Sequence, residues 1–189
     1  MTDERTLNMD LEKYVKKHLP RALNSIVESD RINELPNLTI YEKAIIFAYT
    51  DATINQHQAL NEQLWASQGK NVSDFGHHLE ATLAKLDVYK GLIFRGASDT
   101  YCDVERYKKA NRDKTPVIEY HFLSASKIQI TAQGFGNILF RIYAKSARDI
   151  EKVSKHGNEK EVLFPQCTSF KVVYVTNNGF STIITLKEI

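Results

Sequence analysis

Apolar positions in the first half of the chain recur every three to four residues, which is the period of an amphipathic helix. Thr39 and Glu42 have the spacing of a capping box, which predicts that a helix begins after Thr39. Pro20 separates two shorter apolar segments and predicts a break between them. The predicted helices cover residues 9–18, 21–29, 40–51, 52–65 and 73–86.

Runs rich in β-branched and aromatic residues replace the helical pattern in the second half and predict strands. Asn178-Gly179 predicts a tight turn and a terminal hairpin. The polar, basic stretch 106–114 is interpreted as a solvated loop, with contact to phosphates or to a target protein as the alternative. Helices followed by strands predict an α+β fold class rather than alternating α/β. The predicted strands cover residues 88–94, 117–123, 138–143, 161–164, 170–175 and 180–186.

Composition sets limits on the class of protein. A length of 189 residues fits one domain, or one domain with an extension, and 42% hydrophobic residues are enough to fill a core. The net charge of +2 gives no argument for nucleic acid as a partner. No apolar run approaches the length of a transmembrane segment, and the first residues lack the apolar stretch of a signal peptide.

Cysteine and histidine positions give no sign of a metal site. Cys102 and Cys167 lack metal-ligand spacing, and free thiols are expected rather than a disulfide. The six histidines form no HExxH-type pattern. We therefore predict no bound metal.

Glu159 and Glu161 form a Glu-x-Glu pair directly before an apolar run. In a strand, residues two apart point to the same face, so both carboxylates are predicted to share one site. Two converging acids can divide the work of stabilising positive charge and accepting a proton. Two acids on a solvated strand edge are the alternative. However, Glu161 begins a strand that is predicted to be buried, and a buried carboxylate favours a functional role.

Arg95 ends the apolar run 88–94 and is followed by Gly96. A guanidinium is planar, permanently charged and bidentate, which suits a pyrophosphate. Glycine beside it allows close approach of the backbone to a flat ligand. A structural ion pair is the alternative for an isolated arginine.

Ser124 and Ser126 follow the run 117–123, where hydroxyls can bond a ribose or orient a carboxylate. A simple turn is the alternative. A nucleophilic serine is not indicated, because there is no GxSxG motif and no histidine placed as its base.

An arginine, a serine and a paired glutamate in this order and strand context resemble the Arg–Ser–Glu class of mono-ADP-ribosyltransferases. The resemblance covers about residues 37–189 and is carried by FRG at 94–96, FLSAS at 122–126 and GNEKEVLFPQCTSFKVV at 157–173. It implies a split two-sheet NAD-binding β core preceded by helices. A Rossmann fold is not indicated, since no GxGxxG follows a predicted strand. The family's usual Ser-Thr-Ser motif has Ala125 at its centre here.

The resemblance implies a role for four residues in the cleavage of NAD. Arg95 would hold the NAD phosphates and help to fix the nicotinamide ribose, and the backbone of Gly96 would bond the nicotinamide amide. Ser124 would position that ribose and Glu161. Glu161 would hold the ribose 2′-hydroxyl and stabilise the oxocarbenium-like state as nicotinamide leaves, as a carboxylate does in glycoside cleavage.

Four further parts are implied for binding and acceptor choice. Glu159 would engage the acceptor, and glutamate at this position resembles the arginine-modifying subtype; an arginine with a pKa above about 12 needs a base before it can attack. Ser126 would contribute to the NAD site, and Phe135 would stack on nicotinamide, with a core position as its alternative. The loop 153–158 would face the target protein.

The implied function is transfer of ADP-ribose from NAD, as co-substrate, to an arginine of a target protein, with release of nicotinamide. Two alternatives remain open: an NAD glycohydrolase that uses water as acceptor at the same site, and a non-enzymatic NAD-binding or interaction module. Loss of Glu161 or Arg95 would favour the module, and both are present.

The expected organisation is an N-terminal helical extension over residues 1–36 and a catalytic domain over 37–189. The extension is interpreted either as a secretion, targeting or chaperone-contact segment or as extra helices packed on the domain. The chain resembles a secreted bacterial toxin or effector that acts in a host cell, with the cytoplasm as the alternative location. The expected partner is the target protein, and a chaperone, inhibitor or activator protein is a further candidate.

Overall fold

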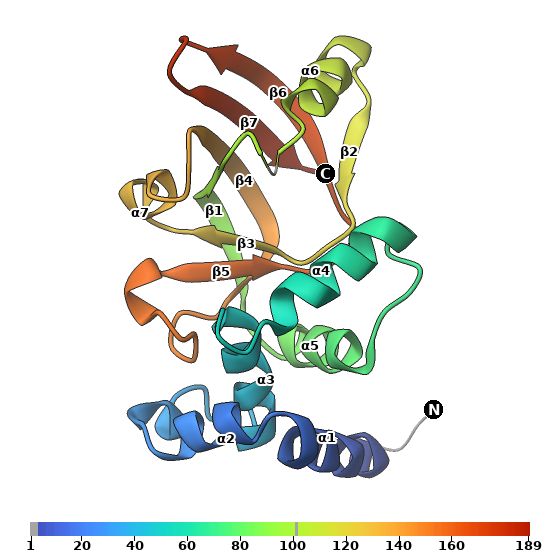
Figure 1. The fold of residues 1–189 in the computed structure, drawn as a ribbon, viewed down its shortest axis with the longest axis vertical. Coiled ribbons are helices and arrows are strands. Elements are labelled where there is room, and N and C mark those ends of the chain that lie inside the picture. Colours follow the sequence, from blue (N-terminus) through green and yellow to red (C-terminus); the bar gives the residue numbers. More distant parts are fainter. Residues whose placement is uncertain (1–3, 101) are drawn as a thin grey trace. The chain divides into compact units, whose positions relative to one another are not determined.

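The computed structural model describes residues 4–100 and 102–189, and the chain forms two compact units, one helical and one built on strands (Figure 1). The helical unit comprises the chain up to Leu86 and the later segment Ile150–Gly157, whereas the sheet unit comprises Asp87–Asp149 and Asn158–Ile189. Most of the helices precede the first strand along the chain, which confirms the α+β fold class. The boundary between residues 36 and 37 stays a prediction.

Helix α3 (Ile40–Thr50) is the centre of the helical unit. It is buried along most of its length, and four helices pack against it. A 3-10 turn, η1 (Asp30–Asn33), precedes it. The four surrounding helices are α1 (Glu4–His18), α2 (Pro20–Val27), α4 (Gln56–Ser67) and α5 (Asp74–Ala84).

The predicted capping box fixes the start of α3. The backbone N–H of Glu42 donates to Thr39 Oγ1 at 3.3 Å, and the N–H of Thr39 donates to Glu42 Oε2 at 2.7 Å. The buried Glu42 also pairs with Lys85 at 2.7 Å, and the buried Lys43 donates to the carbonyl of Ile32 at 2.8 Å. These partners offset the cost of burying charge, so α3 can be covered on all sides.

The segment Ile150–Gly157 leaves the sheet unit and completes the helical core. Val153 and Ser154 are fully buried in it. Arg31 donates from Nε to the carbonyl of Ser154 at 3.1 Å and from Nη2 to that of Lys155 at 3.2 Å. The stretch 153–158, predicted to face a target, therefore begins with buried residues and is exposed only from Lys155 onward.

The described residues contain seven strands. Five follow one another in the order β1-β4-β7-β6-β2, antiparallel except for the parallel pair β4–β7. The hairpin β6–β7 turns at Asn178-Gly179 as predicted, with Gly179 at a positive φ of 88°. The strands are β1 (Val88–Ala97), β2 (Pro116–Glu119), β3 (Leu123–Ser126), β4 (Ile138–Asp149), β5 (Glu161–Phe164), β6 (Thr168–Asn177) and β7 (Thr182–Glu188).

Strands β3 and β5 form a separate antiparallel pair that joins the other five at only two places. Phe94 of β1 pairs with Ser126, and the end of β4 at Arg148 and Asp149 pairs with β5. Both groups of strands contribute to one buried apolar cluster, for example through Ile142 of β4 and Val162 of β5. The β core is therefore divided into a group of five strands and a pair, as the predicted split core requires.

Two segments of the sheet unit differ from the sequence prediction. The stretch 106–114, predicted as a loop, lies mostly in helix α6 (Val104–Asp113). Asp103 Oδ1 caps this helix by accepting from the N–H of Arg106 at 3.1 Å, and Tyr107 and Ala110 bury one side of it against the sheet. The run 117–123, predicted as one strand, is divided between β2 and β3, because β2 pairs with β6 and β3 pairs with β5.

Candidate active site

Arg95 extends from β1 to the serine-bearing strand. Its backbone is fixed by the long ladder to β4, in which it lies opposite Phe140. Its guanidinium Nη1 donates to the carbonyl oxygen of Ser124 at 2.7 Å. The structure thus brings together the arginine and the serine that the sequence predicted, through side chain and main chain respectively.

Ser124 reaches across the β3–β5 pair to Glu161. The Ser124 hydroxyl donates to Glu161 Oε1 at 2.5 Å, and the Glu161 residue is only 6% exposed. The register places Ser126 directly opposite Glu161 and Ser124 opposite Leu163, so the hydrogen bond runs diagonally between the strands. Ser124, Arg95 and the buried carboxylate therefore form one connected group.

Ser126 holds the turn that enters β5. Its hydroxyl donates to the carbonyl oxygen of Glu159 at 2.6 Å and accepts from the N–H of Ile128 at 2.9 Å. The N–H of Lys127 donates to the carbonyl of Lys160 at 3.0 Å. Ser126 therefore acts on the backbone beside the paired glutamates, and the NAD contact predicted for it stays a prediction.

Glu159 and Glu161 do not share the face of one strand, and the geometry predicted for them is wrong. Glu159 belongs to a short 3-10 turn, η2 (Gly157–Glu159), and Lys160 has a positive φ of 51°, so β5 begins only at Glu161. The left-handed residue between them changes the chain direction. Glu159 is accordingly half-exposed while Glu161 is buried.

Gly96 packs against helix α7 (Gln129–Gln133), which the sequence did not predict. A Cβ at Gly96 would lie 1.8 Å from the carbonyl oxygen of Ala132, so no side chain fits there. The glycine is thus required by the close approach of this helix. Phe135 follows α7 and is 57% exposed, which excludes the core alternative for this ring.

A buried polar network around Glu119 was missed in the sequence-based prediction. Glu119 lies at the end of β2 and is 2% exposed. One of its carboxylate oxygens accepts from Tyr107 Oη at 2.7 Å and from Arg106 Nη1 at 3.0 Å. The other oxygen lies 3.7 Å from His121 Nδ1. Burial and the charges of Arg95 and Arg106 lower the pKa of His121 to about 4, against the pull of Glu119. The sequence signal for this network was the position of Glu119 within the apolar run 117–123.

The two cysteines are free, as expected. Burial and the charge of Glu119 raise the pKa of the Cys102 thiol to about 11, so the thiolate is scarce at neutral pH. Among residues 4–100 and 102–189, no three His, Cys, Asp or Glu side chains lie together as metal ligands. Within the same ranges, no helix has both the length and the apolar character needed to cross a bilayer.

This arrangement suits chemistry on a cationic sugar centre. A buried carboxylate with one fixed oxygen can stabilise developing positive charge at short range. Arg95 uses one of its five N–H donors on Ser124, which leaves a fork of donors for an anionic group. A second carboxylate, that of the half-exposed Glu159, lies two residues before Glu161 at the end of η2.

Comparisons with known proteins agree with this chemistry. The family model described as ART, NAD:arginine ADP-ribosyltransferase, matches residues 15–189. A protein of Mycobacterium avium (strain 104), provisionally named NAD(+)–arginine ADP-ribosyltransferase Mav, is 36% identical over 101 residues. That alignment spans 52% of this chain but only 12% of the mycobacterial protein.

Solved structures of low sequence identity share the fold. The ADP-ribosyltransferase HopU1 of Pseudomonas syringae pv. Tomato DC3000 has a TM-score of 0.76 at 18% identity, covering 89% of this chain and 86% of its own. Exoenzyme S from Pseudomonas aeruginosa, solved with human 14-3-3 protein beta and carba-NAD, has a TM-score of 0.70 at 20% identity, with coverage of 97% and 88%. This chain therefore shares the fold of these two structures.

Proposed function

Because the chain belongs to the NAD:arginine ADP-ribosyltransferase family, we propose that it transfers ADP-ribose from NAD to an arginine side chain of a protein and releases nicotinamide. The observation that carries this proposal is the Glu161 carboxylate, buried and held by the Ser124 hydroxyl at 2.5 Å. Burying a carboxylate costs free energy of folding. A buried acid with a fixed orientation is therefore a candidate for a functional residue.

In the proposed reaction, the bond between C1′ of the ribose and the nicotinamide nitrogen breaks. Nicotinamide leaves with the bonding electron pair and becomes neutral, and positive charge develops on the sugar. Glu161 stabilises this charge and holds the 2′-hydroxyl, while Ser124 keeps the carboxylate in place. Glu159 accepts a proton from the acceptor guanidinium, and the nitrogen lone pair that this frees forms the new bond to C1′.

Three residues are proposed to position NAD. Arg95 offers its remaining N–H donors to the pyrophosphate, since one donor is already fixed on the Ser124 carbonyl. The backbone at Gly96 bonds the nicotinamide amide, and the exposed ring of Phe135 stacks on nicotinamide. The carba-NAD complex of Exoenzyme S, which shares this fold, supports NAD as the co-substrate.

The biological setting follows from the same relatives. HopU1 is a bacterial ADP-ribosyltransferase, and the bacterial Exoenzyme S was solved in complex with a human protein, which supports a role for this chain as a secreted effector or toxin that acts in a host cell. Its partner is then a target protein with an accessible arginine. Leu11, Val15 and Ile26 of α1 and α2 are buried in the same unit as α3. Their burial supports the proposal that the extension 1–36 consists of extra helices packed on a catalytic domain over 37–189.

The decisive experiment is an NAD-consumption assay on the wild type and on Glu161→Ala, with agmatine as an arginine mimic and mass spectrometry of the products. ADP-ribosyl-agmatine from the wild type alone supports the proposal. Free ADP-ribose as the sole product, with or without agmatine or a protein acceptor, indicates the glycohydrolase instead. Unchanged NAD cleavage by Glu161→Ala contradicts the role of this carboxylate.

A further inference from the structure

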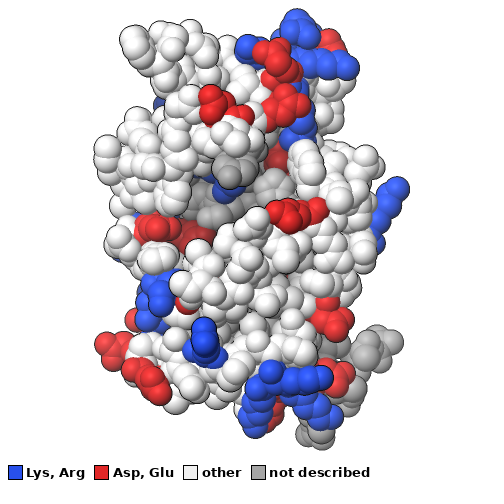
Figure 2. Space-filling view, in the orientation of Figure 1, with Lys and Arg blue, Asp and Glu red and all other residues white. Residues whose placement is uncertain are grey.

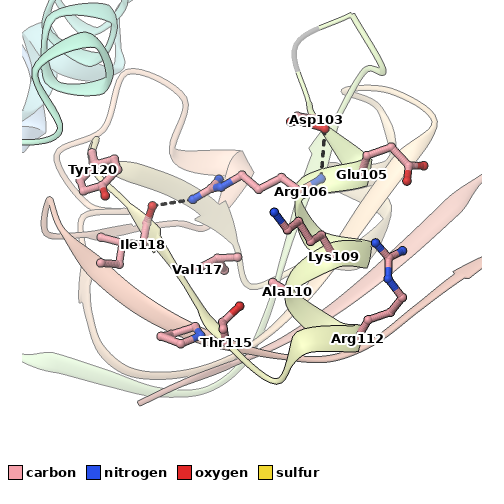
Figure 3. Close-up of a pocket in the computed structure, with 11 residues that line it drawn as sticks. Asp103, Glu105, Arg106, Lys109, Ala110, Arg112, Thr115, Val117, Ile118 and Tyr120 are labelled. Atoms are coloured by element: carbon pink, nitrogen blue, oxygen red, sulfur yellow. Dashed lines mark hydrogen bonds between the residues drawn. The ribbon is translucent and has the colours of Figure 1, made fainter.

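A groove lies between α6 and β2 (Figure 3), and its lining does not include Arg95, Ser124 or Glu161. Its volume is about 610 Å³, which is within the range of sites that hold small ligands or peptide segments. The floor is apolar and includes Ala110, Val117 and Ile118. The walls are α6 on one side and the edge of the sheet on the other.

The charges that line the groove are not equally available. Asp103 caps α6 at 3.1 Å, Glu105 pairs with Lys108 at 2.7 Å, and Arg106 pairs with the buried Glu119 at 3.0 Å. Among residues 4–100 and 102–189, the ion pairs made by α6 involve Arg106 and Lys108, and neither Lys109 nor Arg112 takes part in one. Figure 2 shows Lys and Arg side chains, with acidic ones beside them, gathered where Figure 1 places α6.

Figure 3 shows how these two cations lie. The side chain of Lys109 reaches into the space between α6 and β2, and Arg112 lies at the rim near the end of the helix. The hydroxyl of Thr115 also points into this space. With the acids already paired or capping, the groove presents two available positive charges above an apolar floor.

Strand β2 offers a main-chain edge to the same space. It is the last strand of the sheet, and within residues 4–100 and 102–189 it pairs with β6 alone. Arg106 Nη2 donates to the carbonyl of Ile118 at 2.6 Å, so this carbonyl points away from β6. Ser169, opposite Ile118, accepts from the N–H of Ile189 instead, which agrees with that orientation. Because both polar groups of a residue in an antiparallel strand point to one side, the N–H of Ile118 is directed to the groove as well.

We propose that this groove is a docking site for an extended, acidic segment of a partner protein. Carboxylates of the segment pair with Lys109 and Arg112, an apolar side chain lies on Ala110 and Val117, and a carbonyl accepts from the N–H of Ile118. The lining of α6 from Asp103 to Arg112 spans roughly 15 Å, which is the length of about four to five extended residues.

The composition of the lining favours a protein segment over a nucleic acid. Single-stranded nucleic acids use aromatic platforms for their bases, and Tyr120 is the one aromatic side chain in the lining. Asp103 and Glu105 at the helix start repel anions, so the negative charges of the occupant must lie beside Lys109 and Arg112 at the other end. A peptide can place its carboxylates there alone, whereas a phosphate backbone is charged along its whole length. A peptide in which acidic and apolar side chains alternate matches the separation of the two cations and the apolar floor.

The test measures binding of a fluorescein-labelled peptide of alternating Glu and Leu by anisotropy. The full chain is compared with the double variant Lys109→Glu/Arg112→Glu and with a control of equal charge change, Lys145→Glu/Lys187→Glu, at exposed positions outside the groove. We expect the first double variant to bind at least about tenfold more weakly and the control to bind within about twofold of the wild type. Amide NMR shifts upon titration are expected at Thr115, Val117 and Ile118.

Several results would overturn the proposal. These are no binding to the wild type, equal weakening in both double variants, or NMR shifts confined to other surfaces. Tighter binding of a thymidine decanucleotide that depends on Lys109 and Arg112 would reassign the groove to nucleic acid. ADP-ribosylation of agmatine, measured on the same variants, should stay at the wild-type level. Its absence in the wild type would refute the proposed activity without affecting the binding result.

Discussion

The Ser124 hydroxyl binds Glu161 diagonally across two strands, although Ser126 is the residue directly opposite that glutamate. The two serines therefore act on different parts of the paired acids. Ser124 holds a carboxylate oxygen at 2.5 Å, and Ser126 holds the Glu159 carbonyl at 2.6 Å. The alanine between them contributes to the apolar core, so the family's missing hydroxyl at Ala125 does not interrupt this group.

Replacing Ser124 by Ala should slow NAD cleavage while leaving the fold intact. A hydrogen bond to a charged group contributes about 2 kcal/mol, so we expect kcat to fall roughly 30-fold. Ser169→Ala, at a half-exposed serine of β6, is the matched control and should keep wild-type activity. Equal rates for the two variants would show that Glu161 needs no help from Ser124.

Removing the Glu159 carboxylate should separate the two halves of the reaction. Glu159 is half-exposed in η2, so its loss leaves Glu161 and Ser124 in place. We expect Glu159→Ala to keep at least about half of the NAD hydrolysis and to lose transfer to agmatine by about a hundredfold or more. Parallel loss of both products, quantified by mass spectrometry, would contradict the division of roles.

Adding a single methyl group at Gly96 should destabilise the sheet unit. The new Cβ would meet the Ala132 carbonyl oxygen at 1.8 Å and Phe135 Cβ at 3.0 Å, and the carbonyl is main chain that cannot move aside as a flexible side chain could. We expect a loss of about 1–3 kcal/mol in the free energy of unfolding, measured by urea denaturation. Gly157→Ala, with its closest atom at 3.5 Å, is the control and should change stability by less than about 1 kcal/mol.

His121 should make the stability of the protein depend on pH. Its folded-state pKa is lowered from 6.5 to about 4, so the unfolded chain binds the extra proton between these values. Stability from this group is complete above pH 6.5 and is lost as the pH falls toward 4, by on the order of 3 kcal/mol. His121→Gln should flatten the urea-midpoint profile over this window. The exposed His156→Gln is the control, and parallel profiles for both variants would rule out His121 as the source.

The sequence was most informative where local chemistry determines local structure. The capping box at Thr39, the turn at Asn178-Gly179 and the strand that begins at Glu161 all depend on neighbouring residues, and the structure has each as predicted. Helix α6 also carries local signals, an Asp103 cap and an apolar pair at Tyr107 and Ala110, but its polar composition led to a loop prediction.

Other features depend on partners far away in the chain. Strands β2 and β3 are separate because β2 pairs with β6 and β3 pairs with β5. No residue within 117–123 indicates which partner strand each part will have. The left-handed Lys160 likewise puts Glu159 and Glu161 in different elements, although strand alternation predicted a shared face. The residues of the candidate site were thus found from their order and type, whereas their mutual geometry required the fold.

Completion of the helical unit depends on a segment that follows four of the strands in the chain. Ile150 and Val153 are fully buried in that unit, and their backbone neighbours are bound by Arg31 and Thr50. During synthesis, the helices emerge first but cannot close their core until residue 157 has been made. The nascent chain therefore carries an unfinished helical assembly while β1 to β4 are being added.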